Sequence, residues 1–268
     1  MGKVQYIQGT PLYVGTSGYK YDDWKGTFYP HNVSNYDMLN EYCKYFNFLE
    51  LTYTFYKMPI LKTTLSIAER LKGNTKVSVR INKIFMKGKY TTDDLKEFKD
   101  AIAPLLEEGI GIAYLCDFST KFSASKANFE MMLKLKEDFS ELPIFFELPS
   151  RTWYKERYLE DMRTHSLGLV VVDMPKTTGF APYYPVTTNS NTYFRLYGRS
   201  NLWMIPEEKI LNYSYKDEEL KKIYEDIRRL SIVSNNVFVS FCNLENGRAA
   251  VNALYFADLV GRDERTEF

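Results

Sequence analysis

The sequence predicts a single (β/α)8 barrel over residues 1–268. Eight short apolar segments alternate with helix-like or loop-rich stretches. Polar residues lie at the ends of these segments. The number of residues from one such end to the next is mostly about 30, which is the length of a βα unit with its return strand. The length of 268 residues is also close to the roughly 250 of one such barrel. The predicted strands are 12–16, 46–52, 76–82, 111–117, 143–148, 167–173, 192–198 and 237–243.

The segments carry the patterns of buried strands. In 46–52 and 76–82, polar and apolar residues alternate, so that Phe48, Glu50 and Thr52 share one face. The segment 167–173 is a continuous apolar run, which is typical of a strand covered on both faces. Short strands of this kind fit a barrel that is surrounded by helices.

Amphipathic stretches follow most of the strands, with apolar residues at helical spacing. Asn35 is a suitable N-cap for the first of them. The predicted helices are 35–46, 61–72, 92–107, 125–138, 153–165, 217–230 and 248–260.

No helical pattern follows the sixth predicted strand. The stretch 176–187 is rich in Pro, Gly and Tyr, which favour loops over helices. The step from Asp173 to the next in-phase strand end, Arg195, is also shorter than the roughly 30 residues of a full unit. We therefore expect the sixth helix to be short or absent, with a loop lying over the barrel mouth.

The composition is typical of a globular protein, with 45% hydrophobic and 26% charged residues. The net charge of +1 gives no electrostatic argument for nucleic acid or an anionic membrane as a partner. Three cysteines without a CxxC pair indicate free thiols in a reducing compartment. No apolar run approaches a signal-peptide core or the roughly 18 residues of a membrane span, so we expect a cytoplasmic protein without a membrane partner.

Four carboxylates lie at the ends of predicted strands: Glu50, Asp117, Glu147 and Asp173. In this fold, polar residues at the C-terminal strand ends face the active-site mouth. Crowded carboxylates raise each other's pKa, which can place a general acid beside a general base for glycoside hydrolysis or proton abstraction. We take Glu50, Glu147 and Asp173 as candidate catalytic residues and Asp117 as a candidate substrate-binding residue.

Arginine and aromatic side chains complete the candidate site. Arg80 and Arg195 also lie in strands and would clamp a carboxylate or phosphate through two hydrogen bonds. Aromatic rings offer apolar walls for a small polar, sugar-like or phosphorylated ligand. The competing interpretation is that the charged groups form buried ion pairs that only hold the barrel together. The remaining substrate-binding candidates are Tyr19, Trp24, Trp153, Tyr197 and Asn243.

Other kinds of site have weaker support. Several carboxylates could hold Mg²⁺ or Mn²⁺, but zinc is disfavoured because neither His31 nor His165 lies at a predicted strand end. We therefore assign no metal ligand, and no cofactor is indicated. A basic loop with Lys83, Lys87 and Lys89 follows the third strand and offers nucleic-acid backbone binding as an alternative, although the net charge does not support it.

Five motifs resemble, in order, those of the domain of unknown function 72 family, also called YecE-like. They cover most of the chain, and the first is long and specific. They are GTSGYKYDDWKGTFYP (15–30), ELTYTFYKMP (50–59), FELPSRTW (146–153), RLYG (195–198) and FCN followed by NGRAAVNA (246–253).

The resemblance implies a TIM-like barrel with a cleft at its C-terminal face, but no settled activity. Thr52, Lys87, Asp117 and Tyr197 stand where the family usually has Asn, His, Gln and His, and 149–150 replaces Arg-His. The carboxylates at strand ends are kept while imidazoles are lost. A non-catalytic, degenerate binding module is therefore a further alternative. The positions that match the family are Glu50, Glu147, Trp153, Asp173, Arg195 and Asn243.

Overall fold

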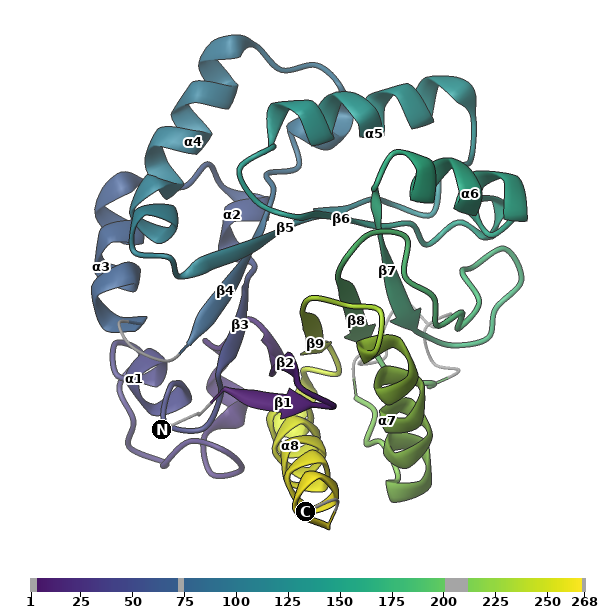
Figure 1. The fold of residues 1–268 in the computed structure, drawn as a ribbon. Coiled ribbons are helices and arrows are strands. Elements are labelled where there is room, and N and C mark those ends of the chain that lie inside the picture. The colour runs from purple at the N-terminus through teal and green to yellow at the C-terminus, as the bar shows by residue number, and fades with distance from the viewer. Residues whose placement is uncertain (1–3, 72–74, 201–211, 267–268) are drawn as a thin grey trace.

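Eight parallel strands form a closed barrel in the computed structural model, which describes residues 4–71, 75–200 and 212–266 (Figure 1). Each strand pairs with the next along the chain, and the pairing of the first barrel strand with the last closes the ring. The (β/α)8 prediction is therefore confirmed. The barrel strands are β2 (Thr10–Ser17), β3 (Phe48–Leu51), β4 (Lys76–Arg80), β5 (Gly111–Asp117), β6 (Ile144–Glu147), β7 (Gly168–Asp173), β8 (Thr192–Leu196) and β9 (Val237–Phe241).

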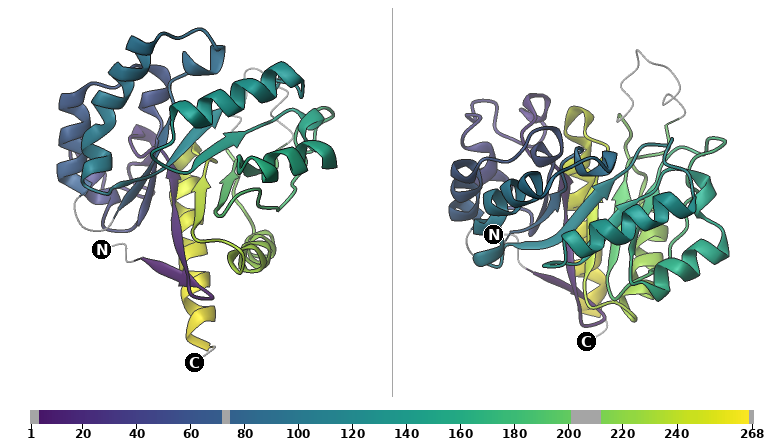
Figure 2. Two further views of the ribbon diagram at one scale, coloured as in Figure 1. Left: turned by 45° about the horizontal axis from the view of Figure 1, so that its top comes forward. Right: turned by 90° about the horizontal axis from the view of Figure 1, so that it is seen from above.

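Helices cover the outside of the ring (Figures 1 and 2). The first begins three residues later than expected and the last continues beyond 260, to Thr266. The predicted end of the second helix, Lys72, lies outside the described residues. The helices are α1 (Met38–Tyr42), α2 (Tyr53–Tyr56), α3 (Leu61–Leu71), α4 (Thr92–Glu107), α5 (Lys126–Asp138), α6 (Glu156–Thr164), α7 (Asp217–Ser231) and α8 (Arg248–Thr266).

The chain between β7 and β8 contains no helix, as the sequence predicted. Residues 174–191 are all described, and none of them is helical. Backbone hydrogen bonds instead hold this segment against the loop that follows β6: Ala181 N–H donates to Pro149 O and Arg151 N–H donates to Gly179 O. A loop therefore takes the place of the sixth helix beside the barrel mouth.

One short strand and one short α-helix of the described residues were not predicted. The strand β1 (Gln5–Ile7) pairs antiparallel with β2, and the Gln5 side-chain amide donates to Ala257 O of α8 at 2.8 Å. Figures 1 and 2 show β1 lying beside α8. The helix α2 directly follows β3. Elements of three or four residues are too short to show a hydrophobic period.

The interior of the barrel is filled by apolar side chains that alternate with the outward-facing ones. Phe48 and Phe238 lie 5.7 Å apart between ring centroids, and Phe145 and Tyr193 lie 5.2 Å apart. Because side chains two residues apart share a strand face, the residues two positions beyond these rings also face inward. The aromatic layer therefore forms the floor beneath the mouth of the barrel.

Among the described residues, no helix combines the length and apolarity needed to cross a membrane.

Candidate functional site

Arg195 lies at the centre of a charged cluster above the aromatic floor. Its Nη1 donates to Glu147 Oε2 at 2.5 Å and to Asp117 Oδ2 at 3.2 Å, and its Nη2 donates to Glu50 Oε1 at 2.8 Å. Burial opposes the guanidinium charge, but Glu147 and Glu50 outweigh it and raise the Arg195 pKa further. With Arg80, these residues form what we call the mouth cluster (Glu50, Arg80, Asp117, Glu147 and Arg195).

Glu50 is fully buried, and both of its carboxylate oxygens are engaged. Oε1 accepts hydrogen bonds from Ser17 Oγ at 2.6 Å and from Arg195, and Oε2 accepts one from Tyr193 Oη at 3.1 Å. A carboxylate with all of these partners is well suited to hold a guanidinium in place. Glu50 is therefore best understood as a positioning residue for Arg195.

Glu147 is the carboxylate whose proton affinity is most altered. Burial disfavours its charged form, and together with Asp117 this outweighs the attraction of Arg195 and raises the pKa of Glu147 to about 7. The hydroxyl of Tyr197 donates to Glu147 Oε1 at 2.8 Å. A carboxyl group with a pKa near neutrality can both donate and accept a proton at physiological pH.

Arg80 and Asp117 form the more open part of the mouth cluster. Arg80 Nη2 donates to Asp117 Oδ2, and the two side chains keep 10% and 16% of their surface exposed. The guanidinium also lies 4.2 Å from the ring centroid of Phe55 and 5.8 Å from that of Tyr56. A ligand that enters the mouth would therefore meet this pair before the buried Arg195.

The arrangement limits the chemistry that the mouth cluster can perform. Both arginines are occupied by carboxylates, which differs from the expected clamp for an anionic ligand. Asp117 Oδ2 and Glu147 Oε2 share one nitrogen of Arg195, which fills the space between them. Retaining glycosidases instead keep room for the scissile bond between carboxyl groups about 5–5.5 Å apart. Proton transfer by a single carboxyl group fits the geometry better.

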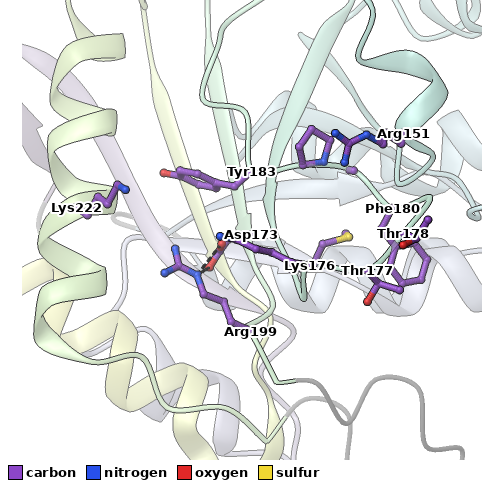
Figure 3. Close-up of a pocket in the computed structure, with 12 residues that line it drawn as sticks. Arg151, Asp173, Lys176, Thr177, Thr178, Phe180, Tyr183, Arg199 and Lys222 are labelled. Carbon is purple, nitrogen blue, oxygen red and sulfur yellow. Dashed lines mark hydrogen bonds and ion pairs between the residues drawn. The ribbon is translucent and has the colours of Figure 1, made fainter.

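Asp173 belongs to a different network from Glu50 and Glu147. Arg199 Nε donates to both of its carboxylate oxygens at 3.0 Å (Figure 3). Tyr215 Oη also donates to this carboxylate, at 2.8 Å. Successive side chains of a strand point to opposite faces. Because Val170 and Val172 fill the barrel interior, Asp173 lies on the outer face of β7. Burial raises the pKa of Asp173 and Arg199 opposes that effect.

Asn243 also faces away from the mouth cluster. Its Nδ2 donates to Tyr213 O at 2.7 Å and to Asn252 Oδ1 at 2.9 Å, which ties the end of β9 to α8. Its position is in phase with Phe241, which packs in the layer between the barrel and the helices. The structure gives Asn243 a role in packing and no contact with either cavity described below.

The four aromatic candidates divide into two groups. Trp24 and Trp153 are fully buried, and their indole N–H groups donate to Leu244 O at 2.6 Å and to Phe122 O at 2.8 Å. Their burial assigns them to loop packing and corrects the expectation that they form walls of a ligand site. Tyr197 contacts Glu147, and Tyr19 lines a cavity.

That cavity, the tyrosine cavity, adjoins the mouth cluster. It has a volume of about 410 Å³, and Glu50 contributes to its wall. The Tyr53 hydroxyl is buried and has no hydrogen-bond partner among the described residues. Tyr56 connects the cavity to Arg80 through the ring contact above. The cavity is lined by Tyr19, Tyr21, Tyr53 and Tyr56, with Gly18, Lys20, Glu50, Leu51, Thr52, Thr63 and Ile67.

Sequence reasoning missed the tyrosines of α2 and a second cavity on the opposite flank of the mouth. Tyr53 and Tyr56 follow β3 directly, and their position just beyond a strand end was an available signal. The second cavity, of about 490 Å³, is lined by Arg199 of the loop after β8 and Lys222 of α7, among others (Figure 3). A lysine on a helix gives no sequence signal for such a position.

Two other kinds of site were considered from the sequence, a metal site and a nucleic-acid site. Within residues 4–71, 75–200 and 212–266, no three His, Cys, Asp or Glu side chains come together as metal ligands would. Arg195 occupies the space between the carboxylates instead. Lys83, Lys87 and Lys89 are exposed, while Arg80 is turned toward Asp117. Nucleic-acid binding by this loop stays a prediction.

Comparisons with known proteins agree with the fold. The profile of the family described as "Protein of unknown function DUF72" matches residues 13–267. A DUF72 family protein from Thermotoga maritima superimposes with a TM-score of 0.84 at 33% identity, over 93% of this chain and 99% of that chain. A DUF72 family protein from Enterococcus faecalis superimposes with a TM-score of 0.83 at 26% identity. The match covers 93% of this chain and 95% of that chain.

A more distant structure, titled as a putative vitamin-B12 independent methionine synthase from Listeria monocytogenes, has a TM-score of 0.51 at 10% identity. It covers 98% of this chain and 99% of that chain, and shows likeness of fold alone. No curated protein matches the chain. The profile match over almost the whole chain and the two close structures show that this chain belongs to the DUF72 family of proteins of unknown function.

Proposed function

We propose that this protein is an enzyme that binds a small, hydroxyl-bearing, sugar-like ligand in the tyrosine cavity and exchanges a proton with it through Glu147. The observation that carries this proposal is the short hydrogen-bonded link between the cavity wall and Glu147, the carboxyl group that holds its proton near neutral pH. Glu50 contributes to the cavity wall and also binds Arg195, which in turn binds Glu147.

The lining of the cavity favours a neutral polar ligand. Four tyrosine rings provide flat apolar surfaces with hydroxyl groups at their edges, which suits molecules with both C–H and O–H faces. The buried Tyr53 hydroxyl lacks a partner among the described residues, and an unpaired buried hydroxyl costs free energy. A ligand hydroxyl that bonds Tyr53 would remove that cost.

The charges of the mouth cluster favour a proton on Glu147. Three carboxylates face two guanidinium groups, so one proton on a carboxylate balances the charge. Glu147 is the member whose pKa lies near 7, and Tyr197 and Arg195 fix its orientation. Asp117 and Arg80 lie next to it at the more open edge, where they would contact and orient the ligand.

The test combines binding and conversion. Monosaccharides are screened by thermal shift, and hits are followed by NMR in D₂O to detect exchange of carbon-bound protons or formation of a new sugar. We expect Tyr53→Phe to weaken binding, while Tyr45→Phe, an exposed tyrosine outside the cavity, leaves it unchanged. Glu147→Gln should retain binding and lower conversion by about 10²–10⁴-fold, the usual contribution of a general acid or base.

Two results would overturn the proposal. Conversion that survives Glu147→Gln would show that another group moves the proton. Saturable binding that depends on Tyr53, with no conversion of any bound sugar, would select the non-catalytic binding module instead.

A further inference from the structure

The second cavity concentrates positive charge on one flank of the barrel mouth. We call it the basic cavity; its volume is about 490 Å³. Arg151, Lys176, Arg199 and Lys222 all contribute to its lining, and they come from four separate segments of the chain. Figure 3 shows Lys222 reaching in from α7 and Arg199 beside Asp173, with Arg151 on the opposite side. Asp173 is the one carboxylate among its described lining residues.

The Asp173 carboxylate does not neutralise the other cations. It is buried, and its oxygens accept hydrogen bonds from Arg199 and Tyr215. Arg199 also pairs with Glu219, at 3.2 Å from Nη1. In the described part of the chain, no carboxylate lies within ion-pair distance of Arg151, Lys176 or Lys222. The cavity therefore keeps an excess of positive charge.

The walls of the basic cavity are held in place by contacts within the protein. The backbone bonds of Arg151 to Gly179 and of Ala181 to Pro149 fasten the loop after β7 to the loop after β6. The Tyr183 hydroxyl donates to Asp226 Oδ2 of α7 at 3.0 Å, which fastens the same loop to that helix. A pocket that is formed before the ligand arrives loses less conformational entropy on binding.

We infer that the basic cavity binds the phosphate monoester group of a small phosphorylated molecule. A phosphate monoester carries close to two negative charges at neutral pH and accepts several hydrogen bonds, which suits converging lysine and arginine side chains. The hydroxyls of Thr177 and Thr178 are further donors in the lining. A volume of 490 Å³ falls within the roughly 300–1,000 Å³ of small-molecule pockets and exceeds the needs of phosphate alone.

The rest of such a molecule would contact the less polar part of the lining. Met174, Phe180, Ala181 and Pro182 provide an apolar wall beside the cations. The basic cavity and the tyrosine cavity share no lining residue, so this inference does not depend on the role of Glu147.

The test measures binding of inorganic phosphate and of a sugar phosphate by isothermal titration calorimetry. Lys176→Gln/Lys222→Gln removes two cations of the cavity, and the matched control is Lys221→Gln on the same helix. Lys221 pairs with Asp217 and does not line the cavity. We expect the sugar phosphate to bind more tightly than phosphate, the double variant to weaken both at least tenfold, and the control to bind within twofold of the parent.

Lys176 and Lys222 are exposed, so we expect the double variant to fold like the parent protein, and unfolding curves of each variant verify this. Absence of saturable binding of both probes to the parent protein would overturn the inference. Equal weakening by Lys221→Gln and by the double variant would also overturn it, because it would show attraction to the general surface charge. Failure of sugar binding at the tyrosine cavity leaves these outcomes unaffected.

Discussion

Arg195 Nη1 donates to Glu147 Oε2 at 2.5 Å, which joins β8 to β6 across the intervening strand β7. Both side chains are almost fully buried, with 2% and 5% of their surface exposed. Through the same guanidinium, Asp117 of β5 and Glu50 of β3 are drawn to the centre of the barrel. One side chain therefore holds three strand ends together in a place that water hardly reaches.

The first prediction concerns this central guanidinium. Arg195→Met should lower the free energy of unfolding by about 3–5 kcal/mol, because it leaves buried carboxylates without their counter-charge. Urea unfolding of the two proteins measures the difference. Arg163→Met is the control: Arg163 forms an exposed pair with Glu156, and such pairs contribute about 0–1 kcal/mol. A similar small loss for both variants would contradict a structural role for Arg195.

The second prediction concerns pH. The folded-state pKa of Glu147 is raised from 4.5 to about 7, so the folded protein holds a proton that the unfolded chain releases between these values. Relative to Glu147→Gln, the parent protein should therefore lose stability as the pH rises through this window. The slope is at most about 1.4 kcal/mol per pH unit.

Denaturant unfolding of both proteins at about pH 5, 6, 7 and 8 checks the sign as well as the size of this effect. The free energy of unfolding of the parent minus that of Glu147→Gln should fall from pH 5 to 7 and level off above pH 7. If the two stability profiles run parallel, or if the parent gains stability across the window, Glu147 does not hold its proton as described.

The third prediction concerns Gly15 in β2. A Cβ atom at this position would lie 1.9 Å from the backbone oxygen of Phe48 in the neighbouring strand, which has no freedom to move aside. Gly15→Ala should destabilise the protein by about 1–3 kcal/mol or more through overpacking. Gly261→Ala in α8, where the nearest atom is 3.8 Å away, should instead stabilise it by about 0.5–1 kcal/mol. Thermal unfolding distinguishes the two directions.

The fourth prediction separates packing from ligand contact at Trp153. Trp153→Phe removes the hydrogen bond to Phe122 O and should cost about 1–3 kcal/mol of stability. Binding to the tyrosine cavity should not change, since Trp153 does not line it. The same unfolding experiments, with ligand titrations, measure both effects. Weaker ligand binding at unchanged stability would restore Trp153 as a wall of the site.

The inner face of several strands could be identified from the sequence. Glu50, Asp117, Glu147 and Arg195 each follow an inward-facing residue at a spacing of two, so the period of a strand places them together at the mouth. The resemblance to the DUF72 family implied the same barrel, and the family profile and similar structures confirmed the family and the fold.

The continuous apolar strand β7 illustrates where sequence reasoning fails. Residues 168–172 are apolar on both faces of the strand, so the sequence does not indicate which face lines the barrel interior. For this reason Asp173 was wrongly grouped with Glu50 and Glu147. Asn243, two residues beyond the end of β9, was misplaced for the same reason. Only the pairing of neighbouring strands decides the phase of a strand that is covered on both faces.

The sequence by itself determined the number and order of the barrel strands, the missing sixth helix and the presence of carboxylates at the mouth, because these features follow from local periodicity and spacing. The tertiary structure alone decided which partner each charge takes. Arg195 reaches residues 145 and 78 positions away in the chain, and Arg199 rather than Arg195 pairs with Asp173. Ion pairing and burial depend on which side chains the closed ring brings together. The local sequence pattern does not indicate which residues far apart in the chain become neighbours in space.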